Sequence, residues 1–279
     1  MQNIIVPTDF SIKSYNALRI AIRIAKKTKG TIHLIHVLEP IVNRYTSMGE
    51  IAEDPMSDVF IRNLIDKLNH ELTVLKRAKE NPSVKIITKL SVGDPFHKIK
   101  DLANQKKADL IIIGNKGFDD PEEFFLGSLT DKVIRSISCP VLTVKEIVDE
   151  GSFKNLVYAT DLKRDHVPMI NLLMRMQDLF GSVIHIVKIN TRNNFSNDID
   201  SQVELETLAD RFELKNYTIN SYAHTDEEYG IVYFADKVDA DLIAIGIHEK
   251  SGFRRLISGG SLSDDVTDHT FRPVLTYHF

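Results

Sequence analysis

The stretch Ala108-Asp-Leu-Ile-Ile-Ile-Gly114, followed by Asn-Lys-Gly117 and, after nine further residues, by Gly127-Ser128, decides the fold of this 279-residue chain. The apolar run predicts a buried parallel strand, and residues 129–137 predict a short helix. Glycines between a strand and a helix let backbone N–H groups approach phosphate oxygens, and the helix N-terminus adds unpaired donors and a positive dipole end. The pattern therefore predicts a nucleotide phosphate site at 114–128, to which Ser128 adds a hydroxyl. The alternative interpretation is a glycine-rich surface turn.

The chain also contains an internal repeat. Five blocks recur in the same order: 3–9 at 155–161, 33–37 at 185–189, 108–114 at 240–246, 127–131 at 260–264 and 140–143 at 273–276. The offset falls from 152 to 132 or 133 along the chain, so we expect the second half to lack most of the loop that the first half has at 39–55. Five ordered matches indicate a duplicated domain.

The length agrees with two domains of about 140 residues each. We predict a first domain at 1–146 and a second at 152–279, joined by a polar linker. Strands and helices alternate in both halves, which predicts a parallel sheet with helices on both faces. The expected strands are 2–8, 31–37, 84–90, 109–113, 141–145, 155–159, 183–189, 216–222, 241–245 and 273–277; the expected helices of the first half are 12–29, 56–79, 95–106 and 128–137.

Three candidate site residues follow strands of the first half. Asp9, Val37 and Gly114 all stand at the carboxyl end of a predicted parallel strand. In such sheets the ligand lies outside the carboxyl ends at a switch point, so these residues are expected to line one crevice. Asp9 has a second interpretation as a helix N-cap or turn residue.

Composition excludes several classes of protein. The net charge is −4 without a long basic stretch, which argues against a nucleic-acid-binding surface. There is no run of about 18 apolar residues and no signal-peptide pattern, and the single cysteine, Cys139, suits a reducing compartment. We therefore expect a cytoplasmic protein with no membrane contact.

The residues 4–11, the stretch 33–37 and the Gly-x2-Gly-x9-Gly-Ser pattern resemble the universal stress protein family, in its tandem two-domain form. This resemblance implies two α/β domains of the flavodoxin-like or adenine nucleotide alpha-hydrolase-like type, each with a five-stranded parallel sheet. It also implies that domains pair through their last strands. In a tandem chain the two halves can form that pseudo-dimer internally, with or without a further homodimer.

The resemblance further implies that the first domain binds ATP, with Mg²⁺ as a candidate companion. Asp9 would accept from the adenine or ribose region, Pro7 and Thr8 would shape the same wall, and Val37 would flank adenine. The ribose and phosphates would lie against the glycine loop and the helix that follows it. The full set of expected ligand-binding residues is Pro7, Thr8, Asp9, Val37, Gly114, Lys116, Gly117, Gly127, Ser128 and Leu129.

Both loops depart from the family pattern. The first contains Asp119-Asp-Pro-Glu-Glu123, four carboxylates that either hold a bridging Mg²⁺ or form a solvated acidic tip. In the second half Glu249 replaces the second glycine, and the loop is one residue longer. Ala159 and Ile189 stand in the places of Pro7 and Val37, which are mild changes. We therefore expect the second half to bind ATP poorly or not at all.

These observations leave three functions open. The leading hypothesis is a nucleotide-binding stress-response regulator or sensor that acts by binding an unidentified protein partner. The alternatives are a slow ATP hydrolase and a nucleotide-free interaction scaffold. The sequence offers no evident general base for phosphoryl transfer and no set of residues with metal-ligand spacing, so we assign no catalytic or metal-binding residue.

Overall fold

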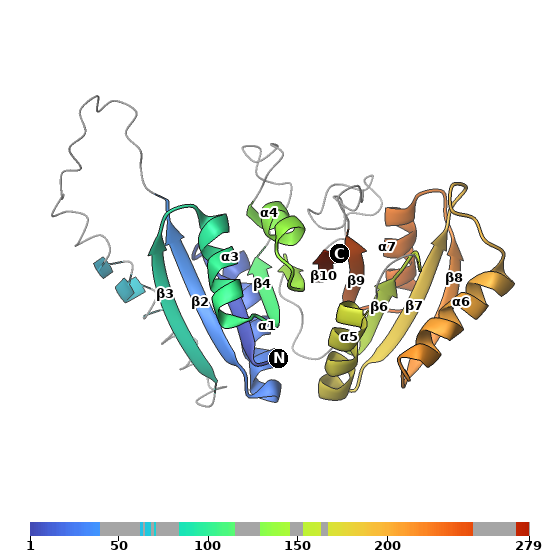
Figure 1. The fold of residues 1–279 in the computed structure, drawn as a ribbon, viewed down its shortest axis with the longest axis horizontal. Coiled ribbons are helices and arrows are strands. Elements are labelled where there is room, and N and C mark those ends of the chain that lie inside the picture. Colours follow the sequence, from blue (N-terminus) through green and yellow to red (C-terminus); the bar gives the residue numbers. More distant parts are fainter. Residues whose placement is uncertain are drawn as a thin grey trace, which may run out of the picture.

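The computed structural model describes residues 1–39, 84–114, 129–145, 153–162, 167–247 and 272–278, together with helical residues 62, 63, 65–67 and 70. Figure 1 shows two α/β halves side by side, with the amino-terminal half in blue and green and the carboxyl-terminal half in yellow to red. Within the described part of the chain, no helix is long and apolar enough to cross a membrane.

The first half alternates strands and helices as the periodicity predicts. Its elements are β1 (Asn3–Pro7), α1 (Ile12–Thr28), β2 (Thr31–Leu38), β3 (Lys85–Val92), α3 (Pro95–Lys106), β4 (Leu110–Gly114), α4 (Leu129–Ser136) and β5 (Val141–Val144). Local signals explain two helix starts. Ser11 caps α1 by accepting from the Ser14 amide, and Asp94 caps α3, with Pro95 in its first turn. Most of the predicted helix at 56–79 lies outside the described residues.

The second half repeats this order. Its elements are β6 (Asn155–Ala159), α5 (Val167–Phe180), β7 (Val183–Asn190), α6 (Asp198–Arg211), β8 (Tyr217–Ala223), α7 (Glu227–Lys237), β9 (Leu242–Ile247) and β10 (Val274–His278). Asn197 caps α6 and Asp226 caps α7 through their side chains. Residues 191–216, which include α6, separate β7 from β8, so this connection has 26 residues, whereas 46 residues separate β2 from β3 in the first half.

The strands form one ten-stranded sheet in the order β3-β2-β1-β4-β5-β10-β9-β6-β7-β8. Pairing is parallel within each half, and β5 and β10 pair antiparallel at the centre. Leu142 lies opposite Leu275 there. The Thr143 hydroxyl donates to the Val274 carbonyl and the Thr276 hydroxyl donates to the Val141 carbonyl, so the two halves contact each other symmetrically. The pairing of halves through their last strands is therefore present within one chain.

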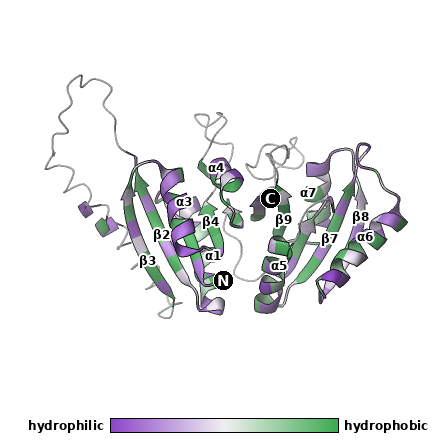
Figure 2. Cartoon of the chain, viewed as in Figure 1, coloured by the Kyte–Doolittle hydropathy of each residue, from purple (hydrophilic) through white to green (hydrophobic). Residues whose placement is uncertain are grey.

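Each face of the sheet carries its own apolar core. One core gathers side chains from α1, α5 and α6, and the other gathers side chains from α3, α4 and α7. Figure 2 shows the consequence in the pattern of hydropathy: the strands are rich in green apolar residues, and the helices are green on one side and purple on the other.

The helices α1 and α5 also hold the halves together. The Lys27 ammonium donates to the Leu179 carbonyl oxygen at 2.6 Å and lies 4.8 Å from the centre of the Phe180 ring. Arg175 of α5 lies 3.7 Å from the Asp109 carboxylate, which itself accepts from the amides of residues 2 and 3. These contacts extend the interface beyond the β5–β10 pair.

Candidate functional site

The carboxyl ends of β1 and β4 meet at the switch point of the first half. The chain leaves β1 for β2 on one side and later returns to place β4 on the other side. This is where ligands bind in open parallel sheets. Asp9 follows β1 by two residues and Gly114 ends β4, so the structure brings these two predicted residues to one place.

The turn after β1 is held by its own polar side chains. The Thr8 amide donates to the Ile35 carbonyl, and the Thr8 hydroxyl accepts from the Phe10 amide and lies 3.1 Å from the Ser14 hydroxyl. Phe10 has a φ of 66°, a left-handed conformation that a side chain seldom adopts. The same turn occurs after β6, where the Leu162 amide donates to the Thr160 hydroxyl and Leu162 has a φ of 63°. Both halves therefore have the same kind of turn after their first strand.

Asp9 lies exposed on this turn. One carboxylate oxygen accepts from the Ser11 amide at 2.9 Å, so Asp9 is a turn residue, while Ser11 is the N-cap of α1. Partial desolvation on the turn raises the pKa of Asp9, but hydrogen bonds from Ser11 and Ser14 outweigh it and leave the pKa below its ordinary value. Asp9 is thus an ionised hydrogen-bond acceptor at the end of β1.

Val37 lies at the neighbouring strand end. The register pairs Pro7 with Ile35, so Asp9 leaves β1 beside the last residues of β2. Pro7 is buried, whereas Val37 is partly buried against the core on the α3 and α4 face. Leu129, the first residue of α4, packs against the same core. An apolar side chain and an ionised acceptor therefore flank this strand edge.

Gly114 has a packing role that the sequence pattern does not reveal. A Cβ atom there would lie 2.4 Å from the Lys13 carbonyl carbon and 2.5 Å from the Ser14 amide nitrogen. The first turn of α1 therefore rests directly on the end of β4, which requires glycine. The other residues predicted for the phosphates, Lys116, Gly117, Gly127 and Ser128, lie outside the described residues.

Two residues near the site were not predicted. Ser14 joins the turn after β1 to α1, since its hydroxyl also donates to the Ser11 carbonyl. His36 donates from Nδ1 to the Thr8 carbonyl oxygen at 2.7 Å, and its ring centre lies 4.5 Å from that of Phe10. The Ser-x-x-Ser spacing that begins at Ser11 is a signal that could have revealed the first of these contacts.

The corresponding place in the second half is filled. Ile189 stands where Val37 stands, and only 3% of it is exposed. A Cβ atom at Gly230 of α7 would lie 2.6 Å from an Ile189 methyl group, so α7 approaches β7 as closely as glycine allows. In the first half Lys98 occupies the position of Gly230, four residues after the N-cap of the helix. Ile189 and α7 thus cover the apolar surface that Val37 leaves partly open.

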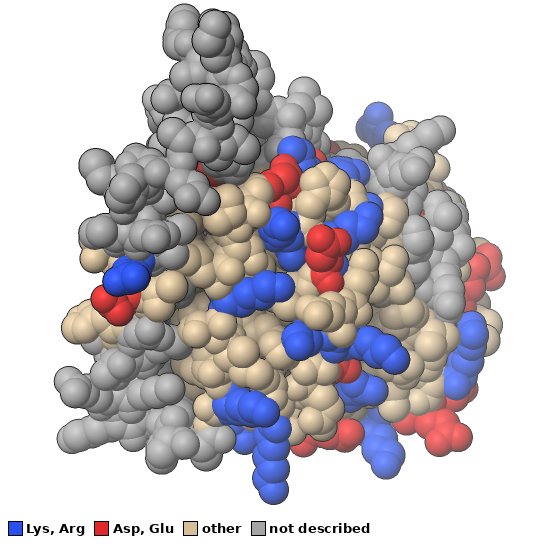
Figure 3. Space-filling view, turned by 60° about the vertical axis from the view of Figure 1, so that its left-hand side comes forward, with Lys and Arg blue, Asp and Glu red and all other residues tan. Residues whose placement is uncertain are grey.

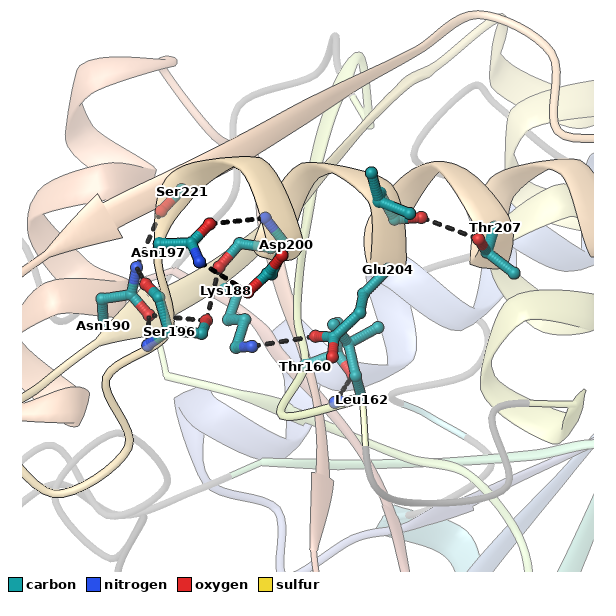
Figure 4. Close-up of polar contacts among 12 residues, drawn as sticks. Thr160, Leu162, Lys188, Asn190, Ser196, Asn197, Asp200, Glu204, Thr207 and Ser221 are labelled. Carbon is teal, nitrogen blue, oxygen red and sulfur yellow. Dashed lines mark hydrogen bonds and ion pairs between the residues drawn. The ribbon is translucent and has the colours of Figure 1, made fainter.

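Helix α6 covers the opposite face of this strand end (Figure 4). The buried Lys188, in the place of His36, donates to the Glu204 carboxylate of α6 at 3.0 Å. Asn190, at the end of β7, donates to the Ser196 carbonyl and the Ser221 hydroxyl. In the second half, the end of β7 is therefore held in a network of internal polar contacts.

The comparisons with known proteins agree with this architecture. Residues 1–145 and 153–278 each match the universal stress protein family. A universal stress protein of Methanocaldococcus jannaschii is 36% identical over 52% of this chain and 82% of its own length, and one of Bacillus subtilis is 31% identical over 50% and 97%. The crystal structure of a universal stress protein from Archaeoglobus fulgidus has the same fold, with a TM-score of 0.68 at 19% identity over 99% of this chain and 98% of that one. The chain therefore belongs to the universal stress protein family, with two tandem domains of that family.

Proposed function

We propose that the first half binds one adenine nucleotide, ATP with Mg²⁺, at the carboxyl ends of β1 and β4. The observation that carries this proposal is the placement of Asp9: an exposed, ionised acceptor beside the partly buried Val37 at the switch point. Adenine needs an apolar surface and a few polar contacts, which this edge offers. The glycine loop, predicted to hold the phosphates, continues from Gly114 of the same edge.

We further propose that the chain acts as a stress-response regulator or sensor that binds a protein partner according to its nucleotide state. The second half does not contribute a nucleotide site, because Ile189 and α7 cover its apolar surface. The proposal predicts binding without appreciable turnover.

A matched pair of substitutions tests the site. Asp9→Asn removes the charged acceptor, and Asp161→Asn makes the same change at the same turn of the second half. We expect Asp9→Asn to weaken ATP binding at least about tenfold in a calorimetric titration, because hydrogen bonds to a charged group contribute roughly 1.5–3 kcal/mol. Asp161→Asn should leave the affinity unchanged. Equal effects at the two positions, or none at either, would refute the proposed site.

A further inference from the structure

The two halves carry opposite charges. Residues 1–145 hold 22 Lys and Arg against 17 Asp and Glu, a net charge of +5, whereas residues 153–278 hold 13 against 19, a net charge of −6. Because the halves share one fold and lie at opposite ends of one sheet, the chain has a basic end and an acidic end. Such an asymmetry orients encounters between molecules.

At the acidic end, large apolar side chains are exposed on α6 and just before it. Ile199 and Val203 lie one turn apart on α6 and are 76% and 56% exposed, and Phe195, two residues before the N-cap Asn197, is 76% exposed. We call these three residues the α6 ridge; Asp200 and Glu206 flank it, since each lies three residues from Val203 at helical spacing. Large apolar side chains aligned on an exposed helix mark an interaction surface.

The α6 ridge is held rigidly by polar contacts (Figure 4). Asn197 caps the helix, the Ser196 and Ser201 hydroxyls are 2.6 Å apart, and Ser221 of β8 donates to Asp198. The Lys188–Glu204 ion pair fixes the middle of the helix to β7. A surface held in this way loses little conformational entropy on binding.

At the basic end, the edge strand β3 carries the matching pattern. Lys85, Ile87 and Lys89 alternate along one face, and all three are exposed, Ile87 to 41%. They pair in register with residues 31, 33 and 35 of β2, which places them on the face that α3 covers. Burial first, and then the Lys106 and Lys85 ammonium groups, lower the pKa of His33, so Lys106 of α3 and Lys85 of β3 act on one region.

We call this surface the β3 face: Lys85, Ile87 and Lys89 with Lys106 of α3. Figure 3 turns this side of the molecule forward and shows more blue Lys and Arg side chains than red Asp and Glu side chains, with tan surface between them. An apolar side chain flanked by lysines is complementary to an apolar line flanked by carboxylates.

We propose that the α6 ridge of one molecule binds the β3 face of a second copy of this chain. Charge complementarity selects this partner, since two α6 ridges would bring like charges together and two β3 faces would do the same. Helix α6 packs beside β8, and β3 and β8 are the two outermost strands of the ten-stranded sheet, so one molecule cannot join its own surfaces. The contact is head to tail, and it extends beyond a dimer unless it closes into a ring.

Sedimentation velocity of the full chain tests self-association first. We expect the mean mass to rise with concentration between micromolar and near-millimolar protein. We also expect association to be at least about tenfold weaker at high than at low ionic strength, because the flanking charges are exposed. A monomer at every concentration in low salt would overturn the proposal and would leave the lysines of β3 only the role of protecting a sheet edge.

A mixing experiment then tests which surfaces meet. The variant Lys85→Glu/Lys89→Glu disables the β3 face, and the variant Ile199→Lys/Val203→Lys disables the α6 ridge. Each variant alone should be monomeric, but a mixture should form a 1:1 dimer, because each molecule retains the surface that the other lacks. A mixture that stays monomeric, or either variant associating like the unmodified chain, would contradict the head-to-tail contact.

The control is Lys26→Glu/Lys29→Glu, which makes the same change of charge in the first half at exposed positions on and just after α1. These residues lie on the other face of the sheet from α3. The control should associate like the unmodified chain. If it abolishes association, net charge and not the β3 face is responsible, and the proposal fails. Circular dichroism of every variant shows that each one is folded.

Discussion

The two halves share one fold and the same turn after their first strand, but the ends of their second strands, β2 and β7, are packed differently. In the first half Val37 stays partly open, and Lys98 stands where α7 has glycine. In the second half Ile189 is buried against Gly230, and Lys188 joins Glu204 beneath α6. The difference teaches that a duplicated domain can keep its framework while a partly open strand end becomes part of the core. A few side chains beside the strand end suffice for this change.

The largest effect is expected from adding one methyl group at each of two glycines. Gly114→Ala forces a Cβ atom against the backbone of Lys13 and Ser14, whereas Gly230→Ala meets the side chain of Ile189. Backbone cannot move aside as a side chain can, so we expect Gly114→Ala to lower the free energy of unfolding by about 3 kcal/mol and Gly230→Ala by about 1–2 kcal/mol. Urea denaturation monitored by circular dichroism measures both. Equal losses would show that the contact of α1 with β4 is no tighter than that of α7 with β7.

A second difference between the halves concerns pH. Burial first, and then the Lys13 ammonium, lower the pKa of Lys145 to about 8 from an ordinary value of 10.5. Between these values the unfolded chain holds more protons at this residue than the folded chain, so its destabilising effect is complete below pH 8 and declines as the pH rises to 10.5. We expect Lys145→Met to be more stable than the unmodified chain at pH 7, by roughly 2–3 kcal/mol, and this advantage to shrink toward pH 10.

His278 provides the control for Lys145, because it ends β10 at the corresponding place in the second half. The difference in unfolding free energy between His278→Met and the unmodified chain should be the same at pH 8 and at pH 10. Chemical denaturation at several pH values measures both variants. A constant difference between Lys145→Met and the unmodified chain would mean that Lys145 titrates alike in the folded and unfolded states.

The smallest effect is expected at the ion pair under α6. Glu204→Gln leaves the buried Lys188 ammonium without its carboxylate, while Lys188→Met leaves a carboxylate whose side chain is 52% exposed. We therefore expect Glu204→Gln to lower the unfolding free energy by about 1–2 kcal/mol and Lys188→Met by less than about 1 kcal/mol. A larger loss of unfolding free energy from Lys188→Met than from Glu204→Gln would contradict the expectation that Lys188 depends more on its partner than Glu204 does.

The sequence predicts the fold well because each element satisfies a local rule. The apolar runs predict every described strand to within two residues, and α3 is predicted to the residue because Asp94 and Pro95 mark its start. The antiparallel β5–β10 contact is different in kind. It joins residues more than 130 positions apart, and only the family resemblance led us to expect it.

The candidate site shows where sequence reasoning stops. The turn at Asp9 follows from its strand-end position, and the structure adds the Thr8 and Ser14 hydroxyls that hold it. The exchange of Val37 for Ile189 is mild by sequence alone. Its consequence depends on Gly230, 41 positions later, which lets α7 approach β7 closely enough to bury the added bulk. A contact between distant residues cannot be recognised from either residue alone.

The most direct test of the account is the stoichiometry of nucleotide binding. A calorimetric titration of the full chain with ATP and Mg²⁺ should give one site per chain. Gly127→Glu should abolish that site, and Gly260→Glu, the same change at the matching position of the second half, should leave it intact. Two sites per chain, or binding that survives Gly127→Glu and is lost with Gly260→Glu, would contradict the claim that only the first half holds the nucleotide.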